Sequence, residues 1–534
     1  MEERTGSSRR DFFKGVAVAT SAVALTAGGA LSLAGCTAAE GGSTAKAKHE
    51  CDVVVAGGGI GGLAAAVSAA ETGAKVILVE ASGKVGGTSR FAAGAFGPRF
   101  GTDWEVVKKK APASDPVLGK YIVENWDPYV EWIDGLGLTT EKLSETSPYL
   151  WMGGKRDAAQ GSKSNTDEYL QQFGQIFADK GGTTLVSTRA VKVLTDDKGK
   201  ATGVRAESNG EVFDIKAKSV ILATGGFQCD KEMVTKYIGR HADLSQAQCI
   251  PYLDGSGIKM GVEVGAQLSR SFGSYYGHPQ PWPADYLNYT DPEAYEAVDN
   301  VDDVHVAYYG TTGHSIQGMG VYLNCAGERF VNEGMGSSLV NQEIMQQYMA
   351  RAYLVFDEPI RKAIETVPFF QAAVIGGARI DHMLEMGFPV FQANSIEELG
   401  KAISSRFDDS ASFNTGNAAS AIAEYNEAVA AGTTAAMKIP HVSVTPPMPI
   451  GTAPFYAIPV VGGIMATFGG LKINGNTEVM GVHGHAIPGL YAVPGCAGGI
   501  MNGDYWCVMS GYSVLGRLSG QQSADFAAAQ GTAK

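Results

Sequence analysis

The pattern of apolar and polar positions first becomes regular after about residue 50. The apolar run Asp52 to Ala56 predicts a buried strand, and a helix-like run from Leu63 to Thr72 follows it. A second apolar run, 75–79, predicts another buried strand that ends at Glu80. This order indicates a strand–turn–helix–strand unit of the kind that builds a parallel sheet.

The turn between the first strand and the helix carries a glycine pattern. It reads G-x-G-x-x-G over Gly57, Gly59, Ile60, Gly61 and Gly62. In such a unit the first glycine permits a tight turn, the second lets the backbone approach a pyrophosphate, and the third lets the helix pack against the strand. Glu80, followed by Ala81, stands where a carboxylate can bind ribose hydroxyls. The alternative, a glycine-rich turn with no ligand, is not favoured because the whole unit is present.

The rest of the chain divides by its pattern into further segments. Helical spacing is expected at 115–135, 166–180, 338–351, 396–405 and 417–431. Alternation between 183 and 223 predicts a meander of strands that ends in a buried strand. We expect a nucleotide-binding domain in two parts, 50–272 and 467–534, around a second domain at 273–466.

Several short motifs match one flavoprotein family in order along the chain. They include Gly86-Gly87-Thr88-Ser89, Ala93-Gly94, Ala223-Thr224-Gly225, Gly327-Glu328-Arg329-Phe330, Gly469-Gly470-Leu471 and Pro488-Gly489-Leu490. With these, the chain resembles the fumarate reductase / succinate dehydrogenase flavoprotein family from about Glu50 to Ala524. The resemblance implies FAD as the cofactor and adds Val191, Gly511 and Ser513 to the expected FAD contacts. It implies an α/β fold, with a discontinuous Rossmann-like FAD-binding domain and an inserted α+β capping domain.

FAD supplies a hydride at its N5, so the protein must position, polarise and protonate the substrate. The family uses Arg and His side chains to hold a small dicarboxylate, and one Arg gives the proton. His278, before Pro279, matches a substrate-contacting His of the family. The other positions differ: Gly313 replaces a Glu beside Thr312, Ile316 a relay Arg, Ser337 the catalytic Arg and Ala466 a His, and Gly503–Trp506 lacks the second Arg.

These replacements argue against fumarate or succinate as the substrate, because burying unpaired carboxylates costs several kcal/mol each, roughly. Small or aromatic residues, namely Ser337, Ala466, Tyr505 and Trp506, predict a roomier and less charged pocket. In this respect the chain resembles cardiac-glycoside reductases and 3-ketosteroid dehydrogenase-like flavoproteins more than true fumarate reductases.

The proton donor is not fixed by the sequence. The candidates are Tyr308, Tyr309, His314 and Tyr505, with His278 as a substrate contact. Steroid-active relatives use Tyr hydroxyls, which favours Tyr505. For each Tyr the alternative is a packed side chain with a satisfied hydroxyl. His483 and His485 are expected in a surface turn.

The N-terminal segment predicts export. Ser8-Arg9-Arg10-Asp11-Phe12 matches a twin-arginine signal, an apolar stretch follows, and Leu33-Ala34-Gly35-Cys36 resembles a lipoprotein cleavage site. We therefore expect a signal at 1–35, a lipidated Cys36 that anchors the protein to the outer face of the cell membrane, and a tether at 36–49. A plain secretory signal or a membrane-spanning helix is the alternative.

Composition limits the partners. The formal net charge of −13, without a long basic run, argues against nucleic acid. The seven Cys residues form no C-x-x-C motif, so no local metal or haem pattern is present in the sequence, although a dispersed cluster remains an alternative. The electrons for FAD must then come from outside the chain, and a membrane or periplasmic cytochrome is the expected donor.

Three functions remain open at this point. The first is an exported FAD-dependent ene-reductase that acts on an enone, an unsaturated lactone or an acrylate-like alkene. The second is a 3-ketosteroid-type dehydrogenase that runs in the opposite direction. The third is a flavin lipoprotein that only carries electrons, against which the large capping region counts.

Overall fold

The structure is a computed structural model that describes residues 47–92, 94–145, 147–154, 166–282, 318–366, 379–385, 388–406, 413–443, 445–503 and 505–531. The predicted signal, Cys36 and most of the predicted tether lie outside the described residues. No helix within the described ranges is long and apolar enough to cross a membrane.

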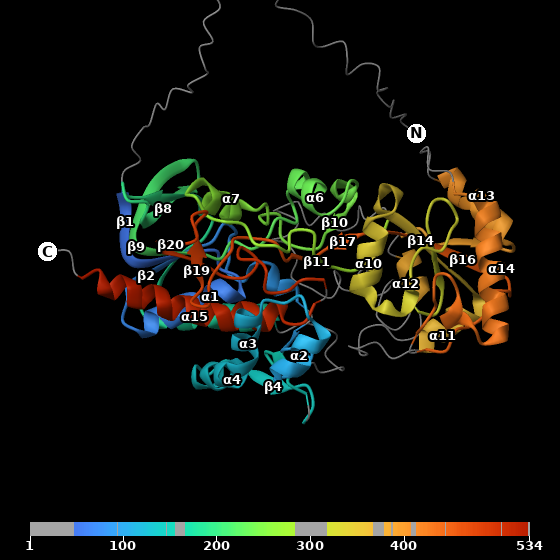
Figure 1. The fold of residues 1–534 in the computed structure, drawn as a ribbon, viewed down its shortest axis with the longest axis horizontal. Coiled ribbons are helices and arrows are strands. Elements are labelled where there is room, and N and C mark those ends of the chain that lie inside the picture. The colour runs from blue at the N-terminus through green and yellow to red at the C-terminus, as the bar shows by residue number, and fades with distance from the viewer. Residues whose placement is uncertain are drawn as a thin grey trace, which may run out of the picture. The chain divides into compact units, whose positions relative to one another are not determined.

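The first large sheet contains the predicted strand–turn–helix–strand unit (Figure 1). Its main path runs β19-β20-β9-β1-β2-β6, and β1 pairs in parallel with both β2 and β9. Four residues of each central strand have almost no exposed surface, as the apolar runs predict. The strands are β1 (Ala47–Ala56), β2 (Val76–Val79), β6 (Thr183–Leu185), β9 (Glu211–Leu222), β19 (Glu478–Met480) and β20 (Ala486–Ala492).

Strand β20 comes from near the end of the chain but pairs in parallel with β9. The sheet is therefore built from two stretches that are far apart in sequence, and the predicted α/β class with a discontinuous Rossmann-like sheet is confirmed. The predicted meander is confirmed as well: β7 (Arg189–Thr195) and β8 (Ala201–Ser208) lead to β9 through antiparallel pairs. The domain boundaries at 272 and 466 stay a prediction.

Two helices pack on this sheet and on each other, α1 (Ile60–Glu71) and α15 (Val508–Ala529) (Figure 1). Their close approach depends on small residues. A Cβ on Gly516 would lie 2.2 Å from the Gly61 carbonyl oxygen, and one on Gly520 would lie 2.2 Å from that of Ala65. Gly520 does not end the last helix: it faces α1, and the helix continues to Ala529.

A second sheet is antiparallel throughout, with the order β12-β16-β14-β13 and β15 beside β16. Figure 1 shows α11, α13 and α14 gathered near β14 and β16. The elements are β12 (Gln280–Pro281), β13 (Val321–Leu323), α10 (Ser337–Met345), β14 (Arg351–Asp357), α11 (Glu358–Thr366), α12 (Arg379–Glu385), β15 (Phe391–Ala393), α13 (Ile396–Arg406), α14 (Thr415–Ala431) and β16 (Phe455–Val461).

Two short ladders join the segment before the second sheet to the segment after it. Strand β10 (Gln246–Ala247) pairs with β17 (Gly463–Ile464), and β11 (Tyr275–Tyr276) pairs with β18 (Ala466–Thr467). The pairing of β11 with β18 brings Tyr276 opposite Ala466. These ladders therefore position the residues at one end of the cavity described below.

The remaining elements belong to neither of the two large sheets. They are β3 (Ala95–Phe96), α2 (Trp104–Lys110), α3 (Pro116–Glu124), α4 (Trp126–Gly135), β4 (Thr140–Lys142), β5 (Leu150–Met152), α5 (Thr166–Asp179), α6 (Lys231–Tyr237) and α7 (Ser256–Glu263). The single helix expected at 115–135 is divided at Asn125, whose φ of −105° and ψ of 10° end α3 and begin α4.

Candidate active site

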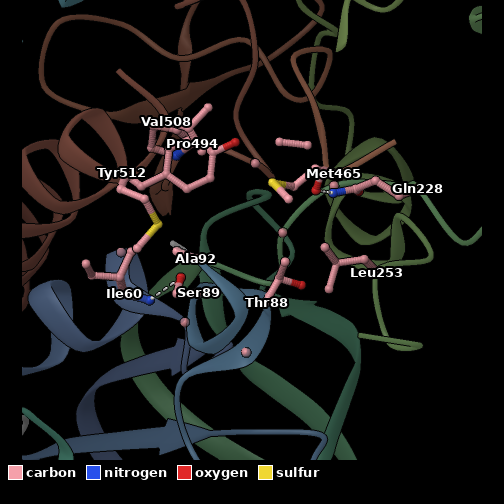
Figure 2. A pocket seen from close by; sticks show the side chains of 18 of the residues that line it. Ile60, Thr88, Ser89, Ala92, Gln228, Leu253, Met465, Pro494, Val508 and Tyr512 are labelled. Atoms are coloured by element: carbon pink, nitrogen blue, oxygen red, sulfur yellow. Dashed lines mark hydrogen bonds between the residues drawn. The ribbon is translucent and has the colours of Figure 1, made fainter. Parts of the chain in front are cut away.

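One cavity of about 640 Å³ extends from the glycine turn to the ladders that join the two parts of the chain. At one end it is lined by Gly57–Gly62 and Glu80, and at the other by His278, Ser337 and Tyr505. Figure 2 shows Ile60 and Ser89 on one wall, facing Tyr512, Pro494 and Met465 on others. The cavity therefore includes residues from both the predicted nucleotide site and the predicted substrate site.

The three glycines of the turn have different surroundings. A Cβ on Gly57, whose φ is +108°, would lie 2.3 Å from the Ala223 carbonyl oxygen, and one on Gly62 would lie 1.9 Å from that of Gly57. A Cβ on Gly59 would meet no protein atom nearer than 3.9 Å. Gly57 and Gly62 are therefore required by packing, whereas Gly59 leaves space in the cavity that a ligand backbone could approach.

The N-terminus of α1 opens on this space. Gly59 precedes the helix without a side-chain cap, the first turn has no acidic residue, and the Ile60 N–H donates to Ser89 Oγ at 3.3 Å (Figure 2). Unpaired N–H groups and the positive end of the helix dipole favour a phosphate here.

Glu80 is buried behind the turn and organises it. Its Oε2 accepts from the Gly58 N–H at 2.7 Å, and its Oε1 accepts from the N–H and hydroxyl of Ser82. Burial raises the pKa of Glu80, and these hydrogen bonds oppose the rise. The carboxylate thus holds the glycine turn, and because Glu80 also lines the cavity it can still accept from a ribose hydroxyl.

At the other end of the cavity, three side chains form a hydrogen-bonded series. His278 Nδ1 contacts Ser337 Oγ, and His278 Nε2 lies 2.8 Å from the Tyr276 hydroxyl. Tyr276 and His278 come two residues apart in an extended segment, so their side chains share a face. His278 and Ser337 are buried, and Tyr276 is partly exposed to the cavity. The series therefore connects a buried hydroxyl to a hydroxyl at the cavity surface.

Tyr505 lies against this series. Its ring is 4.5 Å from that of Tyr276, centroid to centroid, at an interplanar angle of 31°. Burial, with smaller effects of the neighbouring Tyr149 and Tyr276 hydroxyls, raises the pKa of Tyr505 well above its usual value. Both Tyr149 and Tyr505 line the cavity, and burial also raises the pKa of Tyr149. These hydroxyls stay protonated at neutral pH and can act as hydrogen-bond donors.

Positive charge is sparse in the described lining. Its arginines are Arg99 and Arg189. Arg189 forms an ion pair with Asp254 and lies one residue after Thr188, whose N–H donates to the Glu80 carbonyl oxygen, at the nucleotide end. Arg99 is exposed, and its Nη1 donates to the Tyr505 carbonyl oxygen at 3.3 Å. The described residues therefore offer a single guanidinium at the Tyr505 end.

Comparison with known families agrees with this geometry. A family model described as an FAD binding domain matches residues 52–506. The chain belongs to this FAD-binding family. The flavoprotein is 28% identical to a fumarate reductase (cytochrome) of Shewanella frigidimarina over 90% of this chain and 78% of that one. It is 25% identical to a digoxin reductase of Eggerthella lenta over 94% and 93% of the two chains.

The fold also matches solved structures. A 3-ketosteroid Δ1-dehydrogenase from Sterolibacterium denitrificans superposes with a TM-score of 0.68 over 90% of this chain and all of that one, at 17% identity. The family resemblance predicted from the sequence is confirmed, because the relatives and structural neighbours include the reductase and dehydrogenase types that the sequence resembled. The protein is an FAD-dependent, fumarate reductase-like oxidoreductase of the CH–CH class.

FAD fits the residues that are present. The space at Gly59 and the α1 N-terminus suit its pyrophosphate, and Glu80 suits the adenosine ribose. Gln228 is buried in the wall, where its Nε2 donates to the Met465 carbonyl oxygen at 2.7 Å (Figure 2). Its Oε1 has no hydrogen-bond partner among the described residues, which leaves an acceptor for a ligand N–H. No sequence pattern indicated this role for Gln228.

Most of the predicted FAD contacts that the structure describes line the cavity. These are Gly57, Gly59, Ile60, Gly61, Gly62, Glu80, Ala81, Gly87, Thr88, Ser89, Ala223, Thr224 and Gly225. Five predicted contacts that are described do not line it, namely Gly86, Gly94, Val191, Gly511 and Ser513. Val191 is 37% exposed on β7, and the preceding residues Thr188, Arg189 and Ala190 form the wall instead. Ala93 lies outside the described residues.

The helix α15 explains two of these differences. Gly511 and Ser513, which we expected to be FAD contacts, both lie within this helix, which begins at Val508. Ser513 is fully buried and donates to the Met509 carbonyl oxygen at 2.6 Å. The residues of the first turn that reach the cavity are instead Val508, Met509 and Tyr512 (Figure 2).

Only some of the residues predicted to contact the substrate line the cavity. His278, Ser337, Ala466 and Tyr505 line the cavity together. Trp506 does not: it is fully buried, and its indole N–H donates to Ser114 Oγ at 3.0 Å. The candidates Tyr308, Tyr309 and His314, and the positions Thr312, Gly313 and Ile316, lie outside the described residues.

Sequence reasoning missed Tyr276. A signal was available, because Tyr276 precedes the matched His278 by two positions, the spacing that places two side chains on one face of an extended segment.

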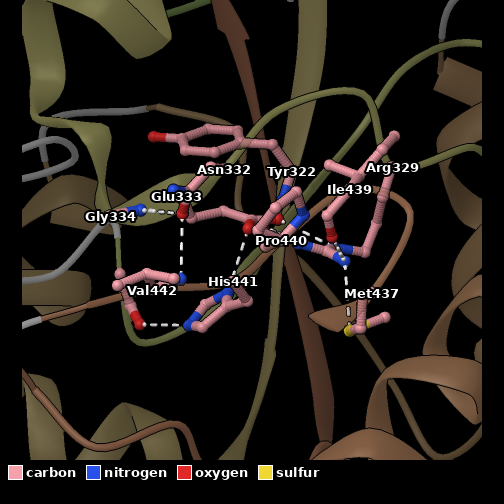
Figure 3. A network of polar contacts seen from close by, with 11 residues as sticks. Tyr322, Arg329, Asn332, Glu333, Gly334, Met437, Ile439, Pro440, His441 and Val442 are labelled. Atoms are coloured by element: carbon pink, nitrogen blue, oxygen red, sulfur yellow. Dashed lines mark hydrogen bonds and ion pairs between the residues drawn. The ribbon is translucent and has the colours of Figure 1, made fainter. Parts of the chain in front are cut away.

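A buried ionic network anchors the segment that carries Ser337 (Figure 3). Glu333 is fully buried and accepts from Arg329 Nη2 at 2.6 Å, and its Oε2 lies 2.9 Å from His441 Nδ1. His441 Nε2 lies 3.0 Å from the Gly318 carbonyl oxygen. Glu333 therefore links Arg329 and His441, and this network fixes the loop before Ser337.

Proposed function

We propose that this flavoprotein reduces the activated C=C bond of a neutral or singly charged substrate, such as an enone, an unsaturated lactone or an aryl acrylate. The observation that carries the proposal is the lining at the Tyr505 end of the cavity. Among described residues it offers one guanidinium, that of Arg99, together with the rings of Tyr149, Tyr276 and Tyr505. Two buried carboxylates would need a cation each, whereas a flat apolar molecule matches the aromatic wall.

The proton donor in this proposal is Tyr276. When Ser337 donates to His278 Nδ1 and His278 Nε2–H donates to the Tyr276 oxygen, the Tyr276 O–H is directed away from His278. That proton can pass to the α-carbon while the β-carbon receives the hydride that FAD supplies. His278 Nε2–H then stabilises the tyrosinate that remains, and solvent in the cavity returns a proton to Tyr276. One C=C bond, one hydride and one proton give one CH–CH bond.

Tyr505 has a second role in this scheme. Burial raises its pKa, so it remains a neutral donor that can polarise the carbonyl group conjugated to the alkene. Polarisation of that carbonyl makes the β-carbon a better hydride acceptor. The earlier preference for Tyr505 as the proton donor is therefore replaced by this division between Tyr276 and Tyr505.

The direction of the reaction is also part of the proposal. The same hydroxyls could polarise a saturated ketone and remove a proton, which is the 3-ketosteroid-type alternative. We favour reduction because the named relatives with high coverage are reductases. The electron donor is proposed to be an external membrane or periplasmic cytochrome.

The test uses the purified FAD-loaded protein, reduced with a viologen dye and mixed with alkenes. Fumarate, cinnamate, a steroid enone and an unsaturated lactone form the panel, and reoxidation of the dye is the readout. Rapid reoxidation by an apolar enone, lactone or aryl acrylate, and not by fumarate, is the expected result. Rapid turnover of fumarate would overturn the proposal. Assays with a saturated ketone and an artificial electron acceptor distinguish the reverse direction.

A further inference from the structure

Two cysteines meet beside the FAD cavity. The Sγ atoms of Cys229 and Cys249 are 3.5 Å apart, although the residues belong to different segments. Cys229 follows β9 in the loop that contains Gln228, and Cys249 follows β10. The Cys229 N–H donates to the Leu253 carbonyl oxygen at 2.9 Å, which holds the two segments together. The backbone therefore holds the two thiols close together beside the cavity.

The two thiols have different environments. Cys249 is fully buried and Cys229 is partly exposed. The hydrogen bond from Cys249 lowers the pKa of Cys229, and the charge of Lys231 acts in the same direction. Burial raises the pKa of Cys249 well above its usual value. Cys229 is thus the more reactive thiol, with a protonated partner directly behind it.

We propose that Cys229 and Cys249 form a redox-active dithiol that a small disulfide oxidises to a disulfide bond. The geometry suits this step, because the two sulfurs must approach only from 3.5 Å to about 2.05 Å. The pair is distinct from a metal site, since no group of three or more metal-ligating side chains occurs among the described residues.

The exchange balances as an ordinary thiol–disulfide reaction. The Cys229 thiolate attacks one sulfur of the external disulfide and releases the first thiolate, which leaves a mixed disulfide on Cys229. Cys249 gives its proton to the released thiolate and attacks the Cys229 sulfur, which releases the second thiolate. The protein loses two hydrogens and two electrons, and the external disulfide gains them as two thiols.

The disulfide would join two segments of the cavity wall. Gln228 is adjacent to Cys229, and Ile250, Tyr252 and Leu253 follow Cys249 closely, and all four line the cavity. The Ile250 N–H also donates to the hydroxyl of Thr88, a predicted FAD contact. Oxidation would therefore restrain the wall around FAD and slow its release. The inference stands on these contacts and does not depend on the proposed substrate.

The test treats the FAD-loaded full chain with oxidised glutathione, blocks remaining thiols with N-ethylmaleimide, and maps peptides without reduction. We expect a peptide in which Cys229 and Cys249 are linked. On dilution, the oxidised protein should release FAD more slowly than the reduced protein, which is seen as a slower rise in FAD fluorescence. The expected intermediate should accumulate in the Cys249→Ser variant as a stable glutathione adduct on Cys229. In Cys229→Ser, Cys249 should remain unmodified until the protein is unfolded.

Cys325→Ser is the matched control, because Cys325 is a buried thiol in the core of the second sheet. This variant should form the linked peptide as the parent chain does. A stable glutathione adduct on Cys229 in the parent chain, with Cys249 still reactive after unfolding, would show a single reactive thiol and overturn the proposal. Alkylation of both thiols after oxidant treatment would overturn it too.

Discussion

Tyr276 is the residue whose chemistry decides the proposed reaction. Its hydroxyl lies 2.8 Å from His278 Nε2, and the residue lines the cavity with its ring against that of Tyr505. A phenol hydroxyl so placed can donate a proton repeatedly only if its own proton is replaced. Solvent in the cavity can replace that proton, because Tyr276 is partly exposed there, and His278, oriented by Ser337, stabilises the tyrosinate until then.

Tyr276→Phe should lower kcat about 10²-fold or more with a small change in KM, since general acid catalysis typically contributes about 10²–10⁴-fold. Steady-state kinetics with the best alkene of the panel measures this split. Ser337→Ala should have a smaller effect, because it removes only the support of His278.

Tyr505→Phe is the informative comparison for Tyr276→Phe. If Tyr505 polarises the substrate carbonyl, loss of its hydroxyl should slow the reduction of enones and lactones. The reduction of FAD by the viologen dye should not change. A Tyr276→Phe enzyme with the parent kcat would remove Tyr276 as the donor.

The glycine turn allows binding and folding to be separated at single positions. Gly59→Ala adds a methyl group that no protein atom approaches within 3.9 Å, at a φ of −67° that Ala accepts. We expect the apoprotein to keep its melting temperature while FAD affinity falls at least about tenfold, or about 1.4 kcal/mol. Fluorescence titration and apoprotein melting provide the two readouts.

Gly62→Ala is the counterpart of Gly59→Ala. Its Cβ would lie 1.9 Å from the Gly57 carbonyl oxygen, so the apoprotein itself should lose stability. Equal apoprotein melting temperatures for the two variants would contradict the distinction between a packing glycine and a cofactor glycine.

The same contrast shows what the sequence could predict. Gly57, Gly59, Gly62 and Glu80 act within one local unit, and their spacing was sufficient to predict their place. The contact of His278 with Ser337 was not predictable in this way, because these two residues meet only through tertiary packing. Trp506 was misassigned for a related reason: whether an aromatic side chain faces a cavity or the core depends on neighbours such as Ser114 that are distant in sequence.

At the scale of elements, α15 packs tightly on α1 through Gly516 and Gly520. Gly516→Ala places a methyl group 2.2 Å from the Gly61 carbonyl oxygen and should cost about 1–3 kcal/mol through overpacking. Because α1 begins at Ile60, its N-terminus should shift and weaken FAD binding as well. Urea unfolding and FAD titration measure both effects.

Gly135→Ala is the matched control for Gly516→Ala. Gly135 is also a helical glycine, at the end of α4, but nothing lies within 4 Å of the Cβ that the substitution would add. We expect this variant to match or slightly exceed the parent stability. Equal stability of Gly516→Ala and Gly135→Ala would contradict the inferred close packing of α1 and α15.

The helix α5 is tied to the loop after Gly86 by a charge contact. Burial raises the pKa of Asp167. The hydrogen bonds and the charge of Arg90, together with Lys84, lower it by more than burial raises it, so the pKa of Asp167 lies below its usual value. A lowered folded-state pKa means that this contribution to stability is present above the unfolded pKa of about 3.9 and is lost as pH falls through the folded value.

Asp167→Asn should therefore be less stable than the parent at pH 7, and the difference in free energy of unfolding should shrink as pH falls below about 4. Urea unfolding of the two FAD-loaded proteins between pH 3 and 7 measures this difference. Glu168→Gln, on the exposed face of the same helix, is the control and should follow the parent. A difference that stays constant with pH would rule out the linkage.

At the scale of the whole molecule, the proposed anchor determines where electrons can enter. We propose that Cys36 carries the lipid that holds the exported protein at the outer face of the membrane. Two or more acyl chains give stable anchoring, so replacing Cys36 by Ala should move the protein from the membrane fraction to the soluble fraction. The purified variant should keep its FAD and its activity with a viologen dye. Retention of Cys36→Ala in the membrane fraction would refute lipid anchoring at this residue.

The pairing of β9 with β20 and the packing of α1 on α15 have a consequence for synthesis of the protein. The glycine turn is made early, but the strand and helix that complete its surroundings lie at 486–492 and 508–529. Such long-range contacts form slowly and only after the intervening chain exists. A ribosome-bound chain that stops before α15 should therefore be unable to retain FAD, so we expect the cofactor to be acquired only after α15 has been synthesised.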